Sequence, residues 1–167
     1  MLNFREYNKN LDMDLEEWSK ENYSKYYSDI KKYALFDESI FQLYKWYKAN
    51  PDQMESIYDK FIVIEENNLK IGIIVINYFI SEKDNQKVFG INPIIVNPKY
   101  INKGFGRKIL KHIISHKGEI CGMTPDRIYA GIDYSNLRCK HLFESLGFIV
   151  VGKTDDNKFM YYELELY

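Results

Sequence analysis

The sequence has little of what marks secreted, membrane or nucleic-acid-binding proteins. Cysteine occurs only at Cys121 and Cys139 in 167 residues, so we expect free reduced thiols rather than a disulfide framework. The longest apolar run, residues 71–80, is interrupted by Asn77 and is too short to span a bilayer. The formal net charge is −1, which provides no positive field for a nucleic-acid backbone. We therefore expect neither a membrane nor a nucleic acid as a partner.

Leader peptides, repeats and linkers are also missing from the pattern. Residues 1–14 carry charges throughout and no continuous apolar segment, so a secretory signal is not predicted and a cytoplasmic location is expected. With only four prolines and nine glycines, and no low-complexity tract, residues 1–167 are predicted to form a single domain. The 46% hydrophobic and 28% charged residues are ordinary for a globular protein.

The hydrophobic periodicity predicts an α/β (α+β) fold, in which helices cover a sheet. Strands are predicted at residues 2–7, 60–65, 70–80, 88–96, 127–133, 148–151 and 158–166. Helices are predicted within residues 11–58, with breaks near residues 36–39 and at Pro51, from about Gly104, and over residues 136–146. Pro93 lies inside a predicted strand and predicts a bulge or splay, because proline donates no ladder hydrogen bond.

Residues 94–107, with the sequence IIVNPKYINKGFGR, run from a strand through a loop into a helix. Gly104 and Gly106 let the backbone turn tightly and approach a ligand. The first turn of the following helix offers unpaired N–H groups and the positive end of its dipole. Basic side chains lie nearby at Lys99, Lys103, Arg107, Lys108 and Lys111. The segment therefore predicts a phosphate or pyrophosphate site.

Two other phosphate motifs do not fit this segment. No G-x-x-x-x-G-K-[ST] string is present, and a dinucleotide fingerprint would need a third glycine where Ile109 stands. A surface turn followed by a solvated basic helix face remains the alternative interpretation of the two glycines.

The same segment resembles motif A of the GNAT superfamily of N-acetyltransferases, hydrophobic-x-V-x-P followed by R/Q-x-x-G-x-G. Residues 136–148, NLRCKHLFESLGF, resemble its motif B, N-x-x-A-x-x-L-Y-E-x-x-G-F. The resemblance covers roughly residues 60–166. It implies a mixed, mostly antiparallel central sheet with two splayed parallel strands, flanked by helices, with residues 11–58 as a helical cover on the acceptor side.

In that family, acetyl-coenzyme A (acetyl-CoA) lies between the two splayed strands. The resemblance implies that Ile94, Ile95 and Val96 pair with the pantetheine arm. It also implies a pyrophosphate held by the backbone of Asn102, Lys103, Gly104, Phe105, Gly106 and Arg107. Asn136 would bond the pantetheine arm or an ordered water, and a helix N-cap is its alternative role. Ile101 departs from the motif, because arginine or glutamine is usual there.

Phe143 of motif B, which the resemblance places beside the coenzyme, stands where many members carry a tyrosine that protonates the leaving thiolate. A phenylalanine cannot do so, and a general acid contributes about 10²–10⁴-fold. The candidate acids are Tyr134, Tyr161 and Tyr162, or water.

The other catalytic groups are a base and an oxyanion donor. Family members often carry a glutamate on the strand that precedes motif A's loop, but residues 88–96 contain none. Glu65, Glu66 and Asp133 are candidate bases, with solvated loop carboxylates as their alternative interpretation. The backbone N–H of Val96 is the expected oxyanion donor.

The resemblance implies an acetyl-CoA-dependent N-acetyltransferase that moves an acetyl group to a primary amine by direct attack in a ternary complex. Two alternatives remain: an acyl-CoA-binding module with little turnover, and a structural protein with a chance glycine loop. The acceptor would be a small-molecule or peptide amine, and the protein a monomer or homodimer.

The acceptor's charge suggests one binding surface. Acidic residues with Trp18 could receive a cation, or they could form a solvated helix face; they are Asp12, Asp14, Glu16, Glu17 and Glu21. No metal site is predicted, because His112 and His116 lack the glutamate of an H-E-x-x-H motif at Ile113.

Overall fold

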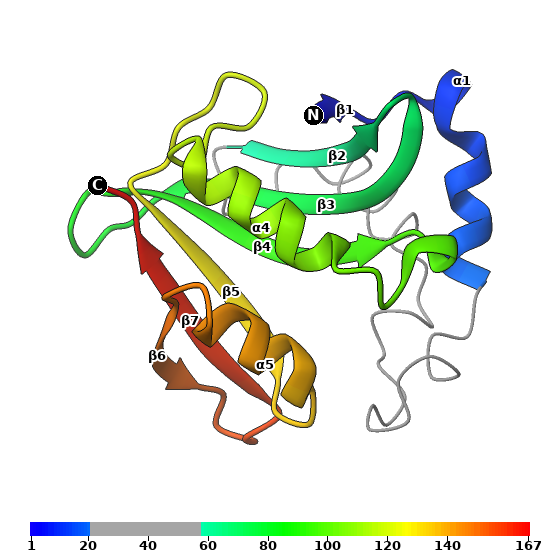
Figure 1. The fold of residues 1–167 in the computed structure, drawn as a ribbon. Helices are drawn as coiled ribbons and strands as arrows, with labels where there is room; N and C mark the ends of the chain where they lie inside the picture. The colour runs from blue at the N-terminus through cyan, green and yellow to red at the C-terminus, as the bar shows by residue number, and fades with distance from the viewer. Residues whose placement is uncertain (21–57) are drawn as a thin grey trace.

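The computed structural model describes residues 1–20 and 58–167, which form a seven-stranded sheet in the order β1-β2-β3-β4-β5-β7-β6 (Figure 1). The strands are β1 Leu2–Glu6, β2 Tyr58–Glu66, β3 Leu69–Ile80, β4 Lys87–Val96, β5 Arg127–Asp133, β6 Ile149–Lys153 and β7 Phe159–Glu165. The helices are α1 Lys9–Asp12, η1 Met13–Lys20, η4 Pro98–Tyr100, α4 Phe105–Ser115 and α5 Leu137–Glu144. The predicted elements differ from these by a few residues at their ends. The helices predicted within residues 21–57 lie outside the described residues.

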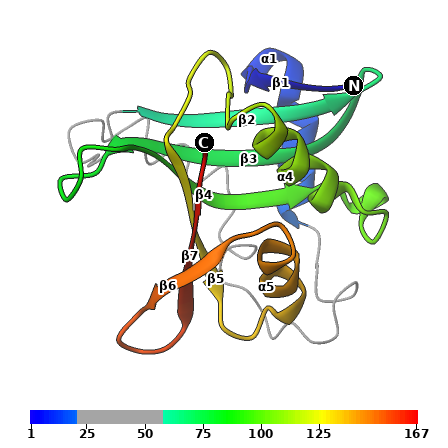
Figure 2. The same cartoon turned by 60° about the vertical axis from the view of Figure 1, so that its left-hand side comes forward.

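The sheet is mixed, as predicted, and one pair of strands is parallel. Val88 to Ile91 of β4 pair with Arg127 to Ala130 of β5, and their pairing ends there. Every other neighbouring pair in the described sheet is antiparallel. The two parallel strands then diverge, so that β5, β7, β6 and α5 form one arm of a V and β1 to β4 the other (Figures 1 and 2).

A bulge in β4 lies where the strands begin to part. Ile74 and Ile76 of β3 pair with Ile94 and Ile91, so a single β3 residue faces both Asn92 and Pro93. The bulge expected at Pro93 is therefore confirmed. It shifts the alternation of β4, because an extra residue moves every later side chain to the other face.

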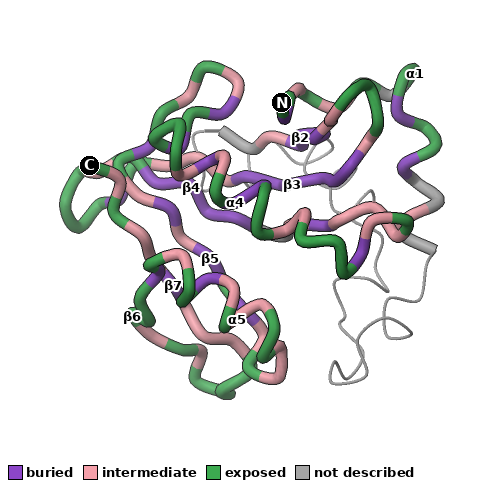
Figure 3. The backbone as a smooth tube through the Cα atoms, in the orientation of Figure 1, coloured by how far each residue is buried: buried purple, intermediate pink, exposed green. Residues whose placement is uncertain are grey.

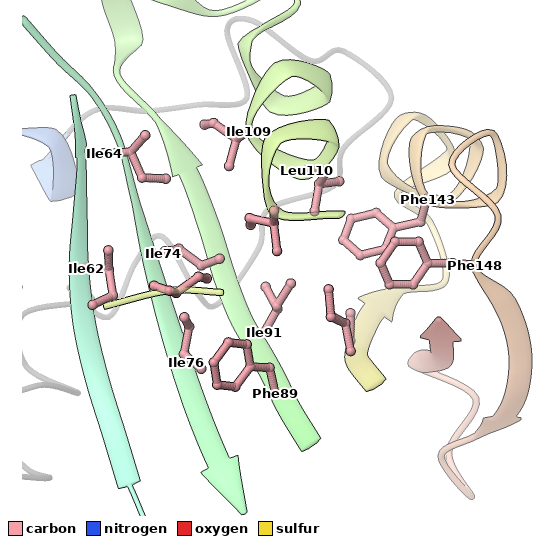
Figure 4. Close-up of a cluster of buried hydrophobic side chains, with 14 of the residues drawn as sticks. Ile62, Ile64, Ile74, Ile76, Phe89, Ile91, Ile109, Leu110, Phe143 and Phe148 are labelled. Carbon is pink, nitrogen blue, oxygen red and sulfur yellow. The ribbon is translucent and has the colours of Figure 1, made fainter. Parts of the chain in front are cut away.

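The main core lies between the sheet and helices α4 and α5, which cover the same face (Figures 2 and 4). Side chains such as Ile74 and Ile91 meet Ile109 and Leu110 of α4, and Phe143 extends this core beneath α5 (Figure 4). The alternation of apolar residues along each strand directs this set to one face.

A second core lies on the opposite face of the sheet and is formed by Leu15, Phe61, Val63, Ile73, Val75, Ile95 and Ile101. Residues 71–76 of β3 are therefore buried without interruption (Figure 3), because both of its faces are covered. The N-terminal segment is held over this face by Arg5, which bonds Asp12 with two nitrogens, both at 2.7 Å.

Candidate active site

The gap between β4 and β5 is the first element of the site, and its walls are backbone. The Asn97 N–H donates to the Ile71 carbonyl of β3 at 2.8 Å. Because antiparallel pairs alternate, Ile95 also faces β3, and the backbone groups of Ile94 and Val96 face the gap.

Ile95 therefore corrects one expectation. Its carbonyl points to β3, where it would lie 2.7 Å from a Cβ added at Gly72, and its side chain is buried in the second core. Only two of the three residues expected to pair with a pantetheine arm, Ile94 and Val96, direct their backbone groups toward the gap.

The loop before α4 is the second element. Asn102 and Gly104 have positive φ angles of 63° and 80°, and Gly104 is the N-cap of α4 without a side-chain cap. A Cβ at Gly104 would meet nothing within 4 Å, so this residue opens onto free space. The first amides of α4 thus face outward without a capping side chain, as an anion site requires.

Gly106 lies where α4 approaches α5. A Cβ there would be in ordinary van der Waals contact with Leu142 of α5, at 3.5 Å.

Four cationic side chains surround this loop. Arg107 donates to the Ser145 hydroxyl at 2.8 Å, and Arg138 donates to the Asn102 side chain at 3.1 Å. Lys103 lies over the Tyr100 ring, and Lys108 pairs with Glu66. Arg138 was not singled out from the sequence, because its approach to the loop depends on how α5 packs beside α4.

The burial of Ile101 explains why this position departs from motif A. Its side chain is 8% exposed and packs in the second core with Val63 and Ile95. The side chain at this position therefore anchors the loop to the sheet by apolar burial and does not face a phosphate.

Asn136 caps helix α5. Its side-chain oxygen accepts a hydrogen bond from the Cys139 N–H at 3.0 Å, so the N-cap role considered for this residue is confirmed. The oxygen is occupied by the cap, and the amide nitrogen is the atom that could still donate to a pantetheine arm.

Phe143 is 4% exposed and its ring packs 4.7 Å from that of Phe148. Tyr162, in the same core, is fully buried and donates its hydroxyl to Glu144 at 3.0 Å. Burial and the Glu144 carboxylate raise the pKa of Tyr162 to about 12. Its proton is thus directed to the helix α5 carboxylate.

The other two candidate acids lie apart from this core. Tyr134 is 59% exposed, with the Lys140 ammonium 4.5 Å from its ring. Tyr161 lies on the opposite sheet face and stacks on Tyr129 with ring centroids 5.3 Å apart. Tyr129, on β5 beside the gap, was missed by the sequence analysis, since only the register of β5 and β7 brings the two rings together.

The candidate bases have polar partners already. Glu65 pairs with Arg5 at 2.7 Å and is separated from the gap by β3. Glu66 pairs with Lys108, and the Lys108 hydrogen bond lowers its pKa. Asp133 accepts from the Ser135 N–H at 2.8 Å and from its hydroxyl at 2.7 Å.

Two acidic side chains of the N-terminal segment also form ion pairs. Asp12 is fully buried against Arg5, and Asp14 pairs with Lys70. The side chains of Glu16 and Glu17, and all of Glu21, lie outside the described residues.

Within residues 1–20 and 58–167, no group of three His, Cys, Asp or Glu side chains could hold a metal ion. The His112 ring stacks on Phe4 and contacts the His116 ring in a tilted arrangement. Neither cysteine is in a disulfide. No helix of the described segments has the length and apolarity needed to cross a bilayer.

The gap, the uncapped start of α4 and the four cations suit a long ligand with a phosphorylated end, so the residues present fit a coenzyme A thioester. This class of site agrees with a comparison of the sequence with known families. The model described as the acetyltransferase (GNAT) family matches residues 13–148. The chain belongs to the GNAT acetyltransferase family.

Solved structures share this fold at low identity. The spermidine N-acetyltransferase from Vibrio cholerae in complex with CoA and spermine is 18% identical, with a TM-score of 0.66 over 99% of this chain and 95% of that one. The ribosomal-protein-S18-alanine N-acetyltransferase from Escherichia coli is 15% identical, with a TM-score of 0.60 over 99% and 94%. A putative acetyltransferase from Salmonella typhimurium with acetyl-CoA is 21% identical, with a TM-score of 0.61 over 99% and 94%. No curated protein matches the sequence.

Proposed function

We propose that the chain is an N-acetyltransferase that binds acetyl-CoA and moves its acetyl group to a primary amine in a ternary complex. The observation that carries this proposal is the parting of β4 from β5 after Ile91 and Ala130, next to the uncapped start of α4. A thioester chain fits between the strands, and its pyrophosphate fits at the helix end.

Coenzyme binding would rest mainly on backbone groups. Ile94 and Val96 offer N–H and C=O groups to the amides of a pantetheine arm, as a neighbouring strand would. The amides of residues 102–107 would receive the pyrophosphate, with Arg107 and Arg138 close to it. Asn136 would add its amide nitrogen from the start of α5.

The reaction needs one bond to form and one to break at the thioester carbonyl. The neutral amine nitrogen attacks the carbon, the carbonyl oxygen takes negative charge, and the carbon–sulfur bond then breaks to release a thiolate. A backbone N–H that faces the gap, at Val96 or at Ile94, would hold the oxyanion. Each such donor removed from an acyl-transfer enzyme typically costs about 10²–10³-fold.

Two protons must also move, one off the amine and one onto the thiolate. Asp133 lies at the end of β5 and is nearer the gap than Glu65, which β3 separates from it. A water between the amine and Asp133 is the simplest route for the first proton. For the second proton, Tyr134 and Tyr161 are better candidates than Tyr162, because the Tyr162 hydroxyl donates its hydrogen bond to Glu144.

Phe143 favours one alternative, an acyl-CoA-binding module of the same fold with little turnover. A free thiol has a pKa near 8.5, so its thiolate leaves without a strong acid at neutral pH. Acetyl transfer is therefore compatible with Phe143, and an amine assay separates the two functions.

A pair of glycine substitutions tests coenzyme binding. Gly104 and Gly122 both have a φ of 80°, and a Cβ at either one would meet nothing within 4 Å. Gly104→Ala and Gly122→Ala should thus each lose about 1–2 kcal/mol of stability from the same backbone strain. Only Gly104→Ala, which places a methyl group at the start of α4, should weaken coenzyme A binding, by about tenfold in calorimetry.

Turnover is measured in parallel as thiol release from acetyl-CoA with a panel of primary amines. Release that rises with amine concentration and yields the acetylated amine supports the transferase. Tight coenzyme binding with no amine-dependent release would indicate the binding module instead. Equal coenzyme affinity in the two glycine variants would refute the assignment of the loop.

A further inference from the structure

The sheet face opposite α4 and α5 carries a polar row that passes directly beneath the opening of the gap. The register places Asn77 of β3 next to Gly90 of β4, Gly90 next to Tyr129 of β5, and Tyr129 next to Glu163 of β7. Ile91 and Ala130, the last paired residues before the strands part, come one position later. This row therefore lies at the narrow end of the V.

Tyr161 lies one row further toward the open end. It pairs with Gly131 on one side and with Gly152 on the other, and a Cβ at either glycine would lie 3.6–3.7 Å from its ring. The two residues paired directly with Tyr161 therefore place no side chain over its ring. Tyr161 and Tyr129 stack with an interplanar angle of 29°, and both are only partly buried.

The charge around these rings is negative. Arg127 bonds Asp84 at 2.6 Å, whereas its distances to Glu163 and Glu165 are 3.9 and 4.0 Å. One guanidinium is thus shared among three carboxylates and is committed chiefly to Asp84. Burial, with Tyr161 and the Glu163 carboxylate nearby, raises the pKa of Tyr129, as expected in negative surroundings.

Among the residues that the structure describes, the cation paired with Glu163 is Arg127 at 3.9 Å. An aromatic face next to such a carboxylate suits an organic cation. A positive group within about 6 Å of a tyrosine ring centroid gains cation–π attraction, and a carboxylate beside it adds Coulomb attraction. The Asp12 and Asp14 carboxylates cannot serve instead, because Arg5 and Lys70 occupy them.

We propose that Tyr161, Tyr129 and Glu163 bind a second cationic group of the acceptor, which is an aliphatic amine with another ammonium on the same chain. This inference rests on the proposed function, which places the reacting nitrogen in the gap. From the middle of the gap to β7 is at least one and a half strand spacings, or about 7 Å at the narrow end of the V. A short methylene chain between two amino groups spans that distance.

Calorimetry on the full chain saturated with coenzyme A tests this with two probes, putrescine and butylamine, which differ by one terminal amino group. Wild type should bind putrescine roughly tenfold or more tightly than butylamine. Glu163→Gln and Tyr161→Leu should each reduce that ratio by about fivefold, and Tyr161→Phe, which keeps the ring, should not. Tyr161→Phe also separates ring binding from an acid role, which would appear as lost turnover.

Glu165→Gln is the matched control, because this carboxylate lies on the same strand and face, further from the gap, at 4.0 Å from the same arginine. Equal affinity of wild type for the two probes, or an equal effect of Glu165→Gln and Glu163→Gln, would overturn the proposal. Thiol release from acetyl-CoA with butylamine is measured separately on the same set of proteins. Its absence counts against the transferase, and the ratio of the two affinities still decides the cation site.

Discussion

The buried ion pair of Asp12 and Arg5 gives a prediction whose size follows from the structure. The Asp12 carboxylate is fully buried, accepts from two Arg5 nitrogens at 2.7 Å each and from the Asn8 N–H at 2.8 Å, and lies 3.2 Å from Lys70. Burial alone would raise the pKa of Asp12, but these hydrogen bonds outweigh it and lower the pKa from 3.8 to about 2. The charged form is therefore stabilised by the fold.

Asp12→Asn should lower the free energy of unfolding by about 2 kcal/mol at pH 7, because each pKa unit corresponds to about 1.4 kcal/mol. The pKa is depressed, so the contribution is complete above pH 3.8 and is lost as the pH falls toward about 2. The difference between wild type and Asp12→Asn should be constant from pH 7 to pH 5 and should shrink below pH 4.

Urea unfolding followed by circular dichroism measures this difference. With an m-value of about 2 kcal/mol/M, the midpoint of Asp12→Asn should fall by about 1 M at pH 7. Asp14→Asn is the control, because the Asp14 carboxylate is 63% exposed beside Lys70 and should contribute less than about 0.5 kcal/mol. Equal midpoints for the two variants, or a difference that persists unchanged at pH 2, would contradict the burial argument.

Three more substitutions have defined outcomes. Ile101→Gln, which restores a family-typical residue, should lose about 2–4 kcal/mol in urea unfolding without tighter coenzyme binding, because that side chain is buried; tighter binding would contradict this. Tyr162→Phe should lose about 1 kcal/mol with the Glu144 hydrogen bond and keep its kcat, whereas a hundredfold drop would make Tyr162 the acid. Gly72→Ala should lose about 1–3 kcal/mol, because its Cβ would lie 2.7 Å from the Ile95 carbonyl; an unchanged urea midpoint would show that β4 yields freely.

The proposed coenzyme side of the site was largely predictable from sequence, because it lies in one continuous segment. Pro93, Gly104 and the basic residues after it are local signals for a bulge, a positive φ angle and an anion site, and the structure contains the bulge and the positive φ angle. Such signals depend on backbone geometry within a few residues. The succession of strands along the chain also followed from hydrophobic periodicity.

The proposed acceptor side was not predictable in the same way. Tyr129 and Glu163 are far apart in sequence and become neighbours only through the register of β5 and β7. The acidic N-terminal residues suggest a cation surface from sequence, but Arg5 and Lys70 pair with two of them, Asp12 and Asp14. Side-chain pairing across distant strands leaves no periodic trace in a single sequence. The sequence alone therefore could not distinguish Asp12 and Asp14, which have close cationic partners, from Glu163, which lies 3.9 Å from Arg127.

The bulge at Asn92 and Pro93 links the two sides of the site. Before it, Ile91 faces the main core; after it, Ile94 does so, three residues later. Without the extra residue, the alternation would place Ile95 in the main core and direct its backbone groups into the gap in place of those of Ile94 and Val96. The bulge therefore coincides with the end of the pairing with β5 and also decides which amides face the gap, so one proline position in the sequence is linked to both the opening and the orientation of its wall.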